Sequence, residues 1–220
     1  MGKTIKLTAN DGHQLDAYVS EATRRVKGSV VIVQEIFGIN PHIRSVCDQY
    51  AQRGYTAIAP ALFDRIEPGI ELDYSPEGVK TGIEYKSKSD DGSALADIGA
   101  AVDHISTAGK VSVIGYCWGG KLTYLAACSV SGVSKAIGYY GGGIGSVIDQ
   151  SPQIPTLLHF GDQDAAIPMA EVEAVIDARP ELEVHIYSAG HGFNCDVRGS
   201  YDKDAADLAL ERTLKFIEGA

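Results

Sequence analysis

The chain has 220 residues, of which 45% are hydrophobic and 22% are charged, so it can bury one sizeable core but is short for two ordinary domains. Its 19 Lys and Arg residues against 29 Asp and Glu residues give a net charge of −10, which would repel nucleic acid and anionic membrane surfaces. We therefore expect one domain over residues 1–220 that acts on a small molecule, with no nucleic-acid or membrane partner.

Cysteine usage and the N-terminal sequence indicate the compartment. The four cysteines lack C-x-x-C spacing and the chain is too large to need covalent cross-links, so neither a disulfide framework nor a zinc site is predicted. The first ten residues lack the apolar segment of a signal peptide, and no run of about 18 apolar residues could span a membrane. These features predict a cytoplasmic protein with reduced thiols.

The first part of the sequence predicts a hairpin followed by alternating strands and helices. Two segments of alternating polarity flank an Asn-Asp-Gly turn, which is typical of a hairpin at a sheet edge. The continuous apolar runs that follow are typical of buried parallel strands. In chain order, the predicted elements are strand 4–8, strand 15–19, strand 30–33, helix 43–53 and strand 56–59.

Residues 60–92 interrupt this alternation. Pro, Gly, Asp and Ser are scattered among isolated apolar positions, with a short helix predicted near 77–85. Long excursions of this kind in α/β proteins often cover a binding site.

The second part of the sequence resumes the alternation. Apolar positions at helical spacing indicate a helix through 95–105, and the last amphipathic pattern predicts a helix that packs on the sheet. The remaining elements are strand 111–114, helix 122–128, strand 136–140, strand 156–160, helix 170–178, strand 184–187 and helix 202–218. The whole pattern predicts an α/β fold with a mostly parallel sheet and helices on both faces.

A G-x-C-x-G motif at 115–119 lies between a predicted strand and a predicted helix. A nucleophile on such a tight turn needs small neighbours, because flanking Cβ atoms would collide there. The helix N-terminus would also favour a thiolate at Cys117 and offer free N–H groups to an oxyanion. The alternative is a buried, unreactive cysteine beside a glycine-rich turn.

An acid and a base follow two later strands. Asp162 and Asp164 lie just after strand 156–160, and His191 lies between glycines after strand 184–187. The chain order Cys, Asp, His, with each residue at the carboxyl end of a strand, is the order of the α/β-hydrolase fold.

Five stretches together resemble the dienelactone hydrolase family. They are VVIVQEIFGIN (30–40), GYCWGG (115–120), GYYGGG (138–143), HFGDQDAAIP (159–168) and AGHGF (189–193), in the order and at the spacing of that family. The resemblance covers nearly the whole chain and implies an α/β-hydrolase fold and an ester or lactone hydrolase activity.

The resemblance also implies roles for the three chemical residues. Cys117 would be the nucleophile, His191 the general base, and Asp164 the residue that orients the imidazole, which agrees with the chemistry of these side chains. The G-x-x-D-x-x-x-P spacing of the family selects Asp164 over Asp162, which is then expected to be a turn residue.

Two further features of the family map onto the strand at 30–33 and its following loop. Glu35 corresponds to the family's acidic residue that pairs with the thiol until substrate arrives; the alternative is a solvent-exposed strand-end residue. The backbone N–H groups of Ile36 and Trp118 would form the oxyanion hole, as this fold builds it.

The substrate-binding residues are less well defined by the sequence. The family arginine two residues after the Phe of His-x-Phe is replaced here by Cys195. Arg65 and Arg198 are the candidate cations for a substrate carboxylate, with a surface charge as the alternative for Arg198. Tyr139 is a candidate pocket residue, although aromatic side chains in a buried strand more often belong to the core.

The other histidines are expected to be structural or solvated. We expect His13, His42 and His104 to be solvated and His159 and His185 to be structural residues in strands. No pair has metal-site spacing, so neither a metal nor a cofactor is predicted.

The sequence therefore predicts a cysteine-dependent hydrolase of small lactones or esters. The substrate that the resemblance implies is the enol-lactone carboxymethylenebutenolide, opened to maleylacetate in aromatic-ring degradation. One alternative is a glyoxalase-like or amidotransferase-like cysteine enzyme, although such proteins lack the ordered Asp and His motifs. Another is a non-catalytic thiol-sensing protein, which would show no burst of thiol acylation by activated esters.

Overall fold

One eight-stranded sheet organises the computed structural model, which describes residues 2–219. The strand order is β1-β2-β4-β3-β5-β6-β7-β8. The pairs β1–β2 and β2–β4 are antiparallel, and all the other pairs are parallel. The strands are β1 (Lys3–Thr8), β2 (Gln14–Ser20), β3 (Gly28–Val33), β4 (Tyr55–Pro60), β5 (Val111–Tyr116), β6 (Val133–Tyr139), β7 (Thr156–Gly161) and β8 (Glu183–Tyr187). The predicted edge hairpin and mostly parallel sheet are confirmed.

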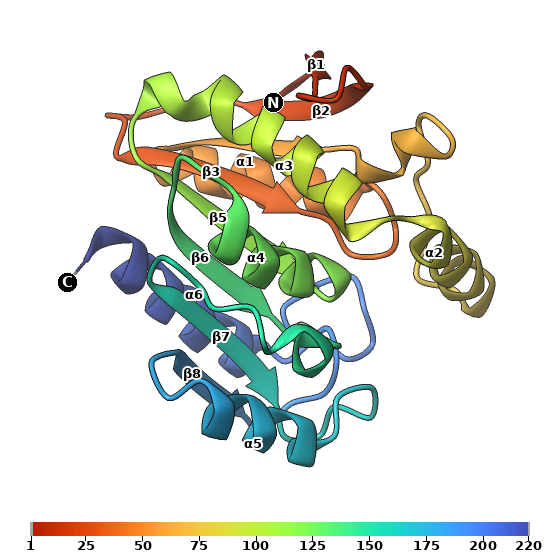
Figure 1. Cartoon of the computed structure of the whole chain (residues 1–220), viewed down its shortest axis with the longest axis vertical. Coiled ribbons are helices and arrows are strands. Elements are labelled where there is room, and N and C mark those ends of the chain that lie inside the picture. The colour runs from red at the N-terminus through yellow and green to blue at the C-terminus, as the bar shows by residue number, and fades with distance from the viewer. Residues whose placement is uncertain (1, 220) are drawn as a thin grey trace.

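Helices cover both faces of the sheet, as predicted. The helices α1 and α6 lie behind the sheet in Figure 1, while α3, α4 and α5 lie in front of it. Alternate residues of the central strands face the two layers: Val30 and Ile32 pack in the core with α1, and Val31 and Val33 pack with α3 and α4. The helices are α1 (Pro41–Gln52), α2 (Pro76–Lys88), α3 (Asp91–Ile105), α4 (Trp118–Ser129), α5 (Met169–Ala178) and α6 (Lys203–Glu218).

The excursion after β4 carries a helix that stands off the main body. It includes a short 3-10 helix (Leu62–Arg65) and then α2, which projects to the right in Figure 1. Only Gly78 and Gly82 of α2 are buried. The helix is longer than predicted because Ser75 caps its N-terminus and three polar residues extend it past 85 without an apolar signal.

Helix α4 begins earlier than the sequence pattern predicted. It starts at Trp118, directly after Cys117, whereas the apolar periodicity indicated a start at 122. Its first turn contains Gly119 and Gly120, which have low helix propensity and hide the helix signal. The consequence is functional, because the helix N-terminus lies immediately at the cysteine.

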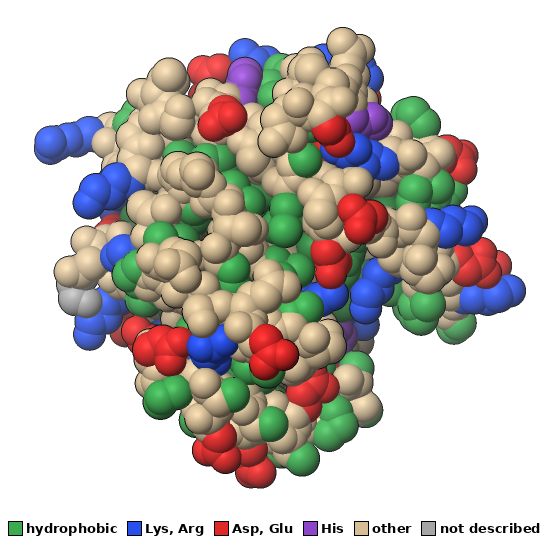
Figure 2. All heavy atoms as spheres, viewed as in Figure 1, with side chains coloured by type: hydrophobic (Ala, Val, Ile, Leu, Met, Phe, Trp, Pro, Cys, Tyr) green, Lys and Arg blue, Asp and Glu red, His purple; other side chains and the backbone are tan. Residues whose placement is uncertain are grey.

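The visible surface carries charged side chains of both signs. On the face shown in Figure 2, acidic and basic side chains are interspersed. Among residues 2–219, no helix combines the length and the apolar composition needed to cross a membrane.

Candidate active site

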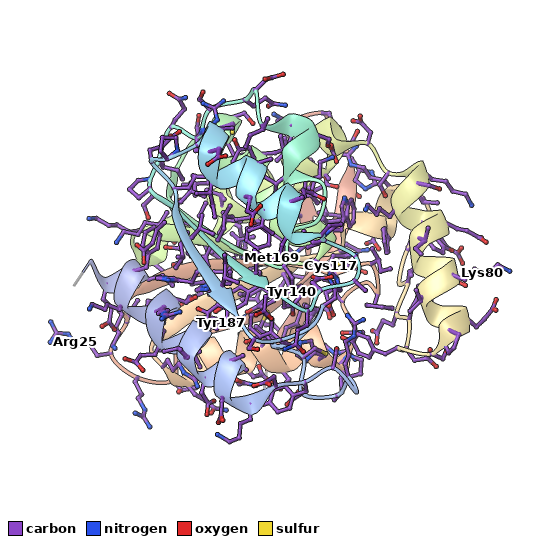
Figure 3. All side chains as sticks on the ribbon, turned by 90° about the horizontal axis from the view of Figure 1, so that it is seen from below. Arg25, Lys80, Cys117, Tyr140, Met169 and Tyr187 are labelled. Carbon is purple, nitrogen blue, oxygen red and sulfur yellow. The ribbon has the colours of Figure 1, made fainter. Side chains whose placement is uncertain are left out.

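Cys117 occupies the sharp turn between β5 and α4. Its backbone has a φ of 55° and a ψ of −118°, a conformation that non-glycine residues rarely adopt. A strained backbone at a reactive side chain is common where the strain presents that side chain to a substrate. In Figure 3, Cys117 lies beside Tyr140 and far from Lys80 on α2.

The glycine after this turn permits a close backbone approach. A Cβ atom on Gly119 would lie 2.5 Å from the carbonyl oxygens of Val33 and Gln34. No side chain fits at that distance, so only glycine lets the start of α4 contact the end of β3. The close contact at Gly119 explains why this position of the G-x-C-x-G motif is a glycine.

Asp164 and His191 are held together at the carboxyl ends of β7 and β8. The His191 Nδ1–H donates to Asp164 Oδ2 at 2.7 Å. The other Asp164 oxygen accepts from the backbone N–H groups of Ala166 and Ile167 at 2.8 and 3.1 Å, which fixes the carboxylate. Asp162 is exposed. The structure therefore brings His191 to the aspartate that the family spacing selects.

His191 has a strongly shifted protonation equilibrium. Burial of the ring acts to lower the pKa of His191, but the interactions with Asp164 and with the Cys117 thiol outweigh it and raise the pKa from 6.5 to about 10. The imidazole is therefore protonated at neutral pH, and a positively charged ring lies next to the sulfur.

The Tyr140 ring packs against the His191 ring. Its ring makes edge contacts with His191 and Phe193 at centroid distances of 5.1 and 5.3 Å. Its φ of 37° is also positive, and its buried hydroxyl hydrogen-bonds to no other group in the described part of the chain. Tyr139 instead points to the α6 side, where its hydroxyl lies 2.6 Å from that of Thr213.

Glu35 is fully buried at the end of β3. Its Oε2 accepts from the Tyr74 hydroxyl at 3.0 Å, and its Oε1 accepts from the Arg198 guanidinium at 3.3 Å. The resemblance implied a pairing with the thiol, whereas here each carboxylate oxygen has another partner. The expected alternative, a solvent-exposed strand-end residue, is wrong.

Arg198 lies directly beside the loop that carries His191. A Cβ atom on Gly192, the neighbour of His191, would be only 2.6 Å from the guanidinium. The Cζ atom of the same guanidinium lies over the neighbouring rings of Phe37 and Tyr74, at 5.8 and 5.5 Å from their centroids. Aromatic contacts and one carboxylate thus hold this cation in place.

Arg65 is engaged elsewhere. It forms a bidentate ion pair with buried Asp97 at 2.7 and 2.8 Å and a further pair with Asp11 at 2.8 Å. Asp97 lies on α3, so this arginine ties the excursion to a covering helix. Of the two candidate arginines, the structure brings Arg198 and not Arg65 to the site, and Tyr139 belongs to the core.

The backbone donors expected for an oxyanion hole are free. The Ile36 N–H follows Glu35, and the Trp118 N–H is the first of α4; within residues 2–219 neither donates to another group. The Trp118 ring stacks on Phe63 at 5.4 Å, and a Cβ on Gly82 of α2 would lie 2.2 Å from the Ile36 carbonyl oxygen. The excursion therefore packs onto both donor segments.

Two residues of this region were not found from the sequence. Tyr74 comes from the middle of the excursion, and no local pattern marks it. His42 was expected to be solvated, but it is buried at 5% exposure, because α1 begins at Pro41 and turns this position inward. His159 is structural, as expected: its two ring nitrogens lie 2.8 and 3.0 Å from the hydroxyls of Tyr187 and Thr213.

Comparison with known proteins gives the family. The family model described as the dienelactone hydrolase family matches residues 15–220. The chain belongs to the dienelactone hydrolase family. It is accordingly a carboxylic ester hydrolase, and its α/β-hydrolase fold agrees with that assignment. The glyoxalase-like and amidotransferase-like alternative is wrong, because the family match covers residues 15–220, including the Cys117 turn and the loops of Asp164 and His191.

Individual relatives cover almost the full length. The carboxymethylenebutenolidase of Pseudomonas putida is 34% identical over 97% of this chain and 94% of its own length. Carboxymethylenebutenolidase 1 of Cupriavidus pinatubonensis is 30% identical over 97% and 95%. A crystal structure from Klebsiella pneumoniae, provisionally named a dienelactone hydrolase, superposes with a TM-score of 0.80 at 30% identity, covering 96% of this chain and 97% of that one.

Proposed function

We propose that this dienelactone hydrolase family member is a cysteine-dependent hydrolase of small lactones or esters. Cys117 is the nucleophile, His191 the acid and base, and Asp164 the residue that orients the ring. One observation carries the proposal: the 2.7 Å bond from His191 to a fixed Asp164, with His191 in contact with the strained Cys117 turn. The residues of this site lie in a single domain, and the reaction uses neither a metal nor a cofactor.

The proposed reaction has two steps. In acylation, the Cys117 thiolate attacks the lactone carbonyl, and the N–H groups of Ile36 and Trp118 hold the resulting oxyanion. The C–O bond of the ring breaks, the leaving oxygen takes the proton of His191, and a thioester remains. In deacylation, neutral His191 takes a proton from water, which attacks the thioester. The acid is released, and the thiolate and the protonated ring are restored.

Because the pKa of His191 is raised, the imidazole ring carries the proton that is transferred in the first step. A histidine with a pKa of about 10 is charged at neutral pH, so it begins as the acid for the leaving group. It becomes the general base only after acylation has removed its proton. Asp164 stabilises the charged ring throughout and keeps its orientation.

The proposed substrate is a small carboxylated enol lactone. The relatives from Pseudomonas putida and Cupriavidus pinatubonensis are named carboxymethylenebutenolidases, which favours carboxymethylenebutenolide as substrate and maleylacetate as product, in aromatic-ring degradation. Arg198 is the cation that would bind the substrate carboxylate, since a guanidinium pairs bidentately with that group. The substrate would then compete with Glu35 for Arg198.

The cysteines support a place for this activity in the cytoplasm. All four are free thiols, two of them fully buried. Free thiols persist in a reducing compartment, where the nucleophile Cys117 also stays reduced.

A spectrophotometric substrate screen tests the proposal. The protein would be assayed with cis- and trans-dienelactone and with p-nitrophenyl esters of increasing acyl length, beside Cys117→Ala as a control. We expect a clear preference for the small carboxylated lactone and no turnover by the variant. A preference for long neutral esters would reject the substrate class, and equal rates for the variant would reject the nucleophile. A folded protein without turnover or an acylation burst would support the thiol-sensing alternative.

A further inference from the structure

A compact group of buried ligand-type side chains lies outside the proposed reaction steps. It comprises Glu35 at the end of β3, His42 in the first turn of α1, and Cys195 in the loop after β8. One potential metal-binding atom from each residue lies within 4.8 Å of the corresponding atoms of the other two. The three side chains are all buried, at 0%, 5% and 0% exposure. Carboxylate, imidazole and thiol thus meet in the interior.

The imidazole of His42 has one engaged nitrogen and one free nitrogen. Its Nδ1 lies 3.2 Å from Asp196 Oδ1, while its Nε2 is buried and hydrogen-bonds to no group among residues 2–219. An unsatisfied buried nitrogen destabilises a protein, so such atoms are rare without a function. A carboxylate on one ring nitrogen and a metal ion on the other is the usual arrangement of metal-binding histidines.

The donor set indicates which metal would fit. A thiolate, an imidazole and a carboxylate together suit Zn²⁺, which takes sulfur, nitrogen and oxygen ligands in a tetrahedral site, whereas Mg²⁺ and Ca²⁺ take oxygen ligands. The charged groups facing the cluster are Glu35, Asp196 and Arg198. Glu35, Asp196 and a Cys195 thiolate would carry three negative charges. These would balance the positive charge of Arg198 and the two charges of a divalent cation.

One member of the cluster, His42, borders a cavity. A cavity of about 90 Å³ between α1 and α6 is lined by His42 and Asp196. The His42 side chain itself is only 3% exposed.

We propose that Glu35, His42 and Cys195 form a binding site for one Zn²⁺ ion or a similar borderline-soft divalent cation. The metal would take Sγ of Cys195, whose proton leaves to solvent, and Nε2 of His42. It would also take Oε1 of Glu35, which then releases Arg198, while Tyr74 keeps its bond to Oε2. A water completes the four ligands, as in other sites with three protein ligands. This proposal does not depend on the proposed function.

Binding of Co²⁺ as a spectroscopic probe tests the site. A cobalt–thiolate bond gives an intense charge-transfer band in the near ultraviolet, which carboxylate or imidazole ligands alone do not give. The catalytic pair Cys117 and His191 is the rival thiol and imidazole site, so the titration is done on the wild type and on Cys117→Ala. We expect both to bind one Co²⁺ per chain with this band, and Zn²⁺ to displace it.

Two variants of the cluster and one matched control complete the experiment. We expect Cys195→Ser to lose the band, His42→Gln to weaken binding at least tenfold, and Cys128→Ser, a half-buried thiol elsewhere, to change nothing. Circular dichroism of the metal-free proteins shows which variants are folded. If only one of the two cluster variants folds, that variant alone is enough to test the site. Loss of the band in Cys117→Ala, its persistence in folded Cys195→Ser, or no band in the wild type would overturn the proposal.

Discussion

The candidate site has two halves that are built in different ways. The half that reacts in the proposed mechanism, called the reacting half, consists of Cys117, Asp164 and His191, which lie one, three and four residues after the ends of β5, β7 and β8. The carboxyl ends of parallel strands share one edge of a sheet, so the fold itself brings these residues together. The other half, Glu35, Tyr74 and Arg198, joins the end of β3 to two long loops. Its members meet only because those loops pack as they do.

This difference indicates which part of the site can change more easily while the fold stays the same. The reacting half depends on strand register and on glycines that admit close backbone contact, so few sequences satisfy it. The binding half depends on side chains that loops can supply from several positions, as the replacement of the family arginine by Cys195 and the placement of Arg198 illustrate. The chemistry is thus expected to be harder to alter than the choice of substrate.

The largest expected effect comes from the reacting half. Cys117→Ala should lower kcat/KM for any substrate by more than about 1,000-fold, because the variant has no nucleophile. The midpoint of thermal unfolding should hardly change, since this half-exposed side chain contributes little packing. Ester hydrolysis and a thermal melt measure the two effects.

The same experiment includes a chemical and a positional control. Cys117→Ser should also be slow, because a serine hydroxyl is a much weaker acid than a thiol, and Cys128→Ser should keep full activity. Retention of more than about one hundredth of the activity by Cys117→Ala would contradict the mechanism.

The second effect is a dependence of stability on pH. The folded pKa of His191 is about 10, above its ordinary value of 6.5, so the ring binds its proton more tightly in the folded state. This contribution is fully present below pH 6.5 and is lost as the pH rises through about 10. We expect the free energy of unfolding to fall in this window by about 4 kcal/mol more in the wild type than in His191→Gln, since each pKa unit corresponds to about 1.4 kcal/mol.

Urea denaturation at intervals from pH 6 to pH 10 measures this difference. Asp164→Asn removes one cause of the shift, so its curve should lie between those of the wild type and His191→Gln. Parallel curves for the wild type and His191→Gln would show that the folded and unfolded states hold this proton equally.

The sequence predicts the reacting half better than the binding half for a physical reason. The motif around Cys117 specifies its own backbone geometry, and the chain order of Asp164 and His191 follows from the strands. By contrast, Arg65 and Arg198 look alike in the sequence, and only tertiary packing sends one to Asp97 and the other to Glu35.

Small shifts in register and helix starts account for the other differences. Strand β6 ends at Tyr139, whose hydroxyl lies near Thr213, while Tyr140 follows the strand with a φ of 37° and contacts the His191 ring. The start of α1 at Pro41 buries His42, which a start at 43 leaves outside the helix. Periodicity locates such boundaries only to within a few residues, which is enough to misplace a side chain.

The third effect belongs to the binding half. Arg198→Lys should raise KM for a carboxylated lactone about tenfold, because lysine cannot pair bidentately with a carboxylate. KM for a neutral aryl ester should change little. The net charge of −10 does not alter this expectation, since salt screens distant charges beyond about 10 Å.

Arg65→Lys is the matched control for this substitution. The Arg65 guanidinium is bound by Asp97 and Asp11, so the variant should lose stability but treat the two substrates as the wild type does. If Arg198→Lys affects the carboxylated and the neutral substrate alike, Arg198 does not bind the substrate anion. A neutral or larger ester would then be the better substrate candidate.

The smallest expected effect concerns the link between the two halves. Glu35 is a buried carboxylate that directly follows Gln34, whose carbonyl oxygen lies against Gly119, two residues after Cys117. Glu35→Gln removes a negative charge that disfavours a nearby thiolate, and it should raise the alkylation rate of Cys117 by neutral iodoacetamide about threefold at pH 7. Mass spectrometry of the labelled peptide gives the rate for that one thiol across the pH range.

The control is Glu77→Gln, at an exposed position on α2, which should leave the alkylation rate of Cys117 unchanged. An unaltered pH profile in Glu35→Gln would mean that the carboxylate serves only Arg198 and Tyr74, and that the two halves act independently.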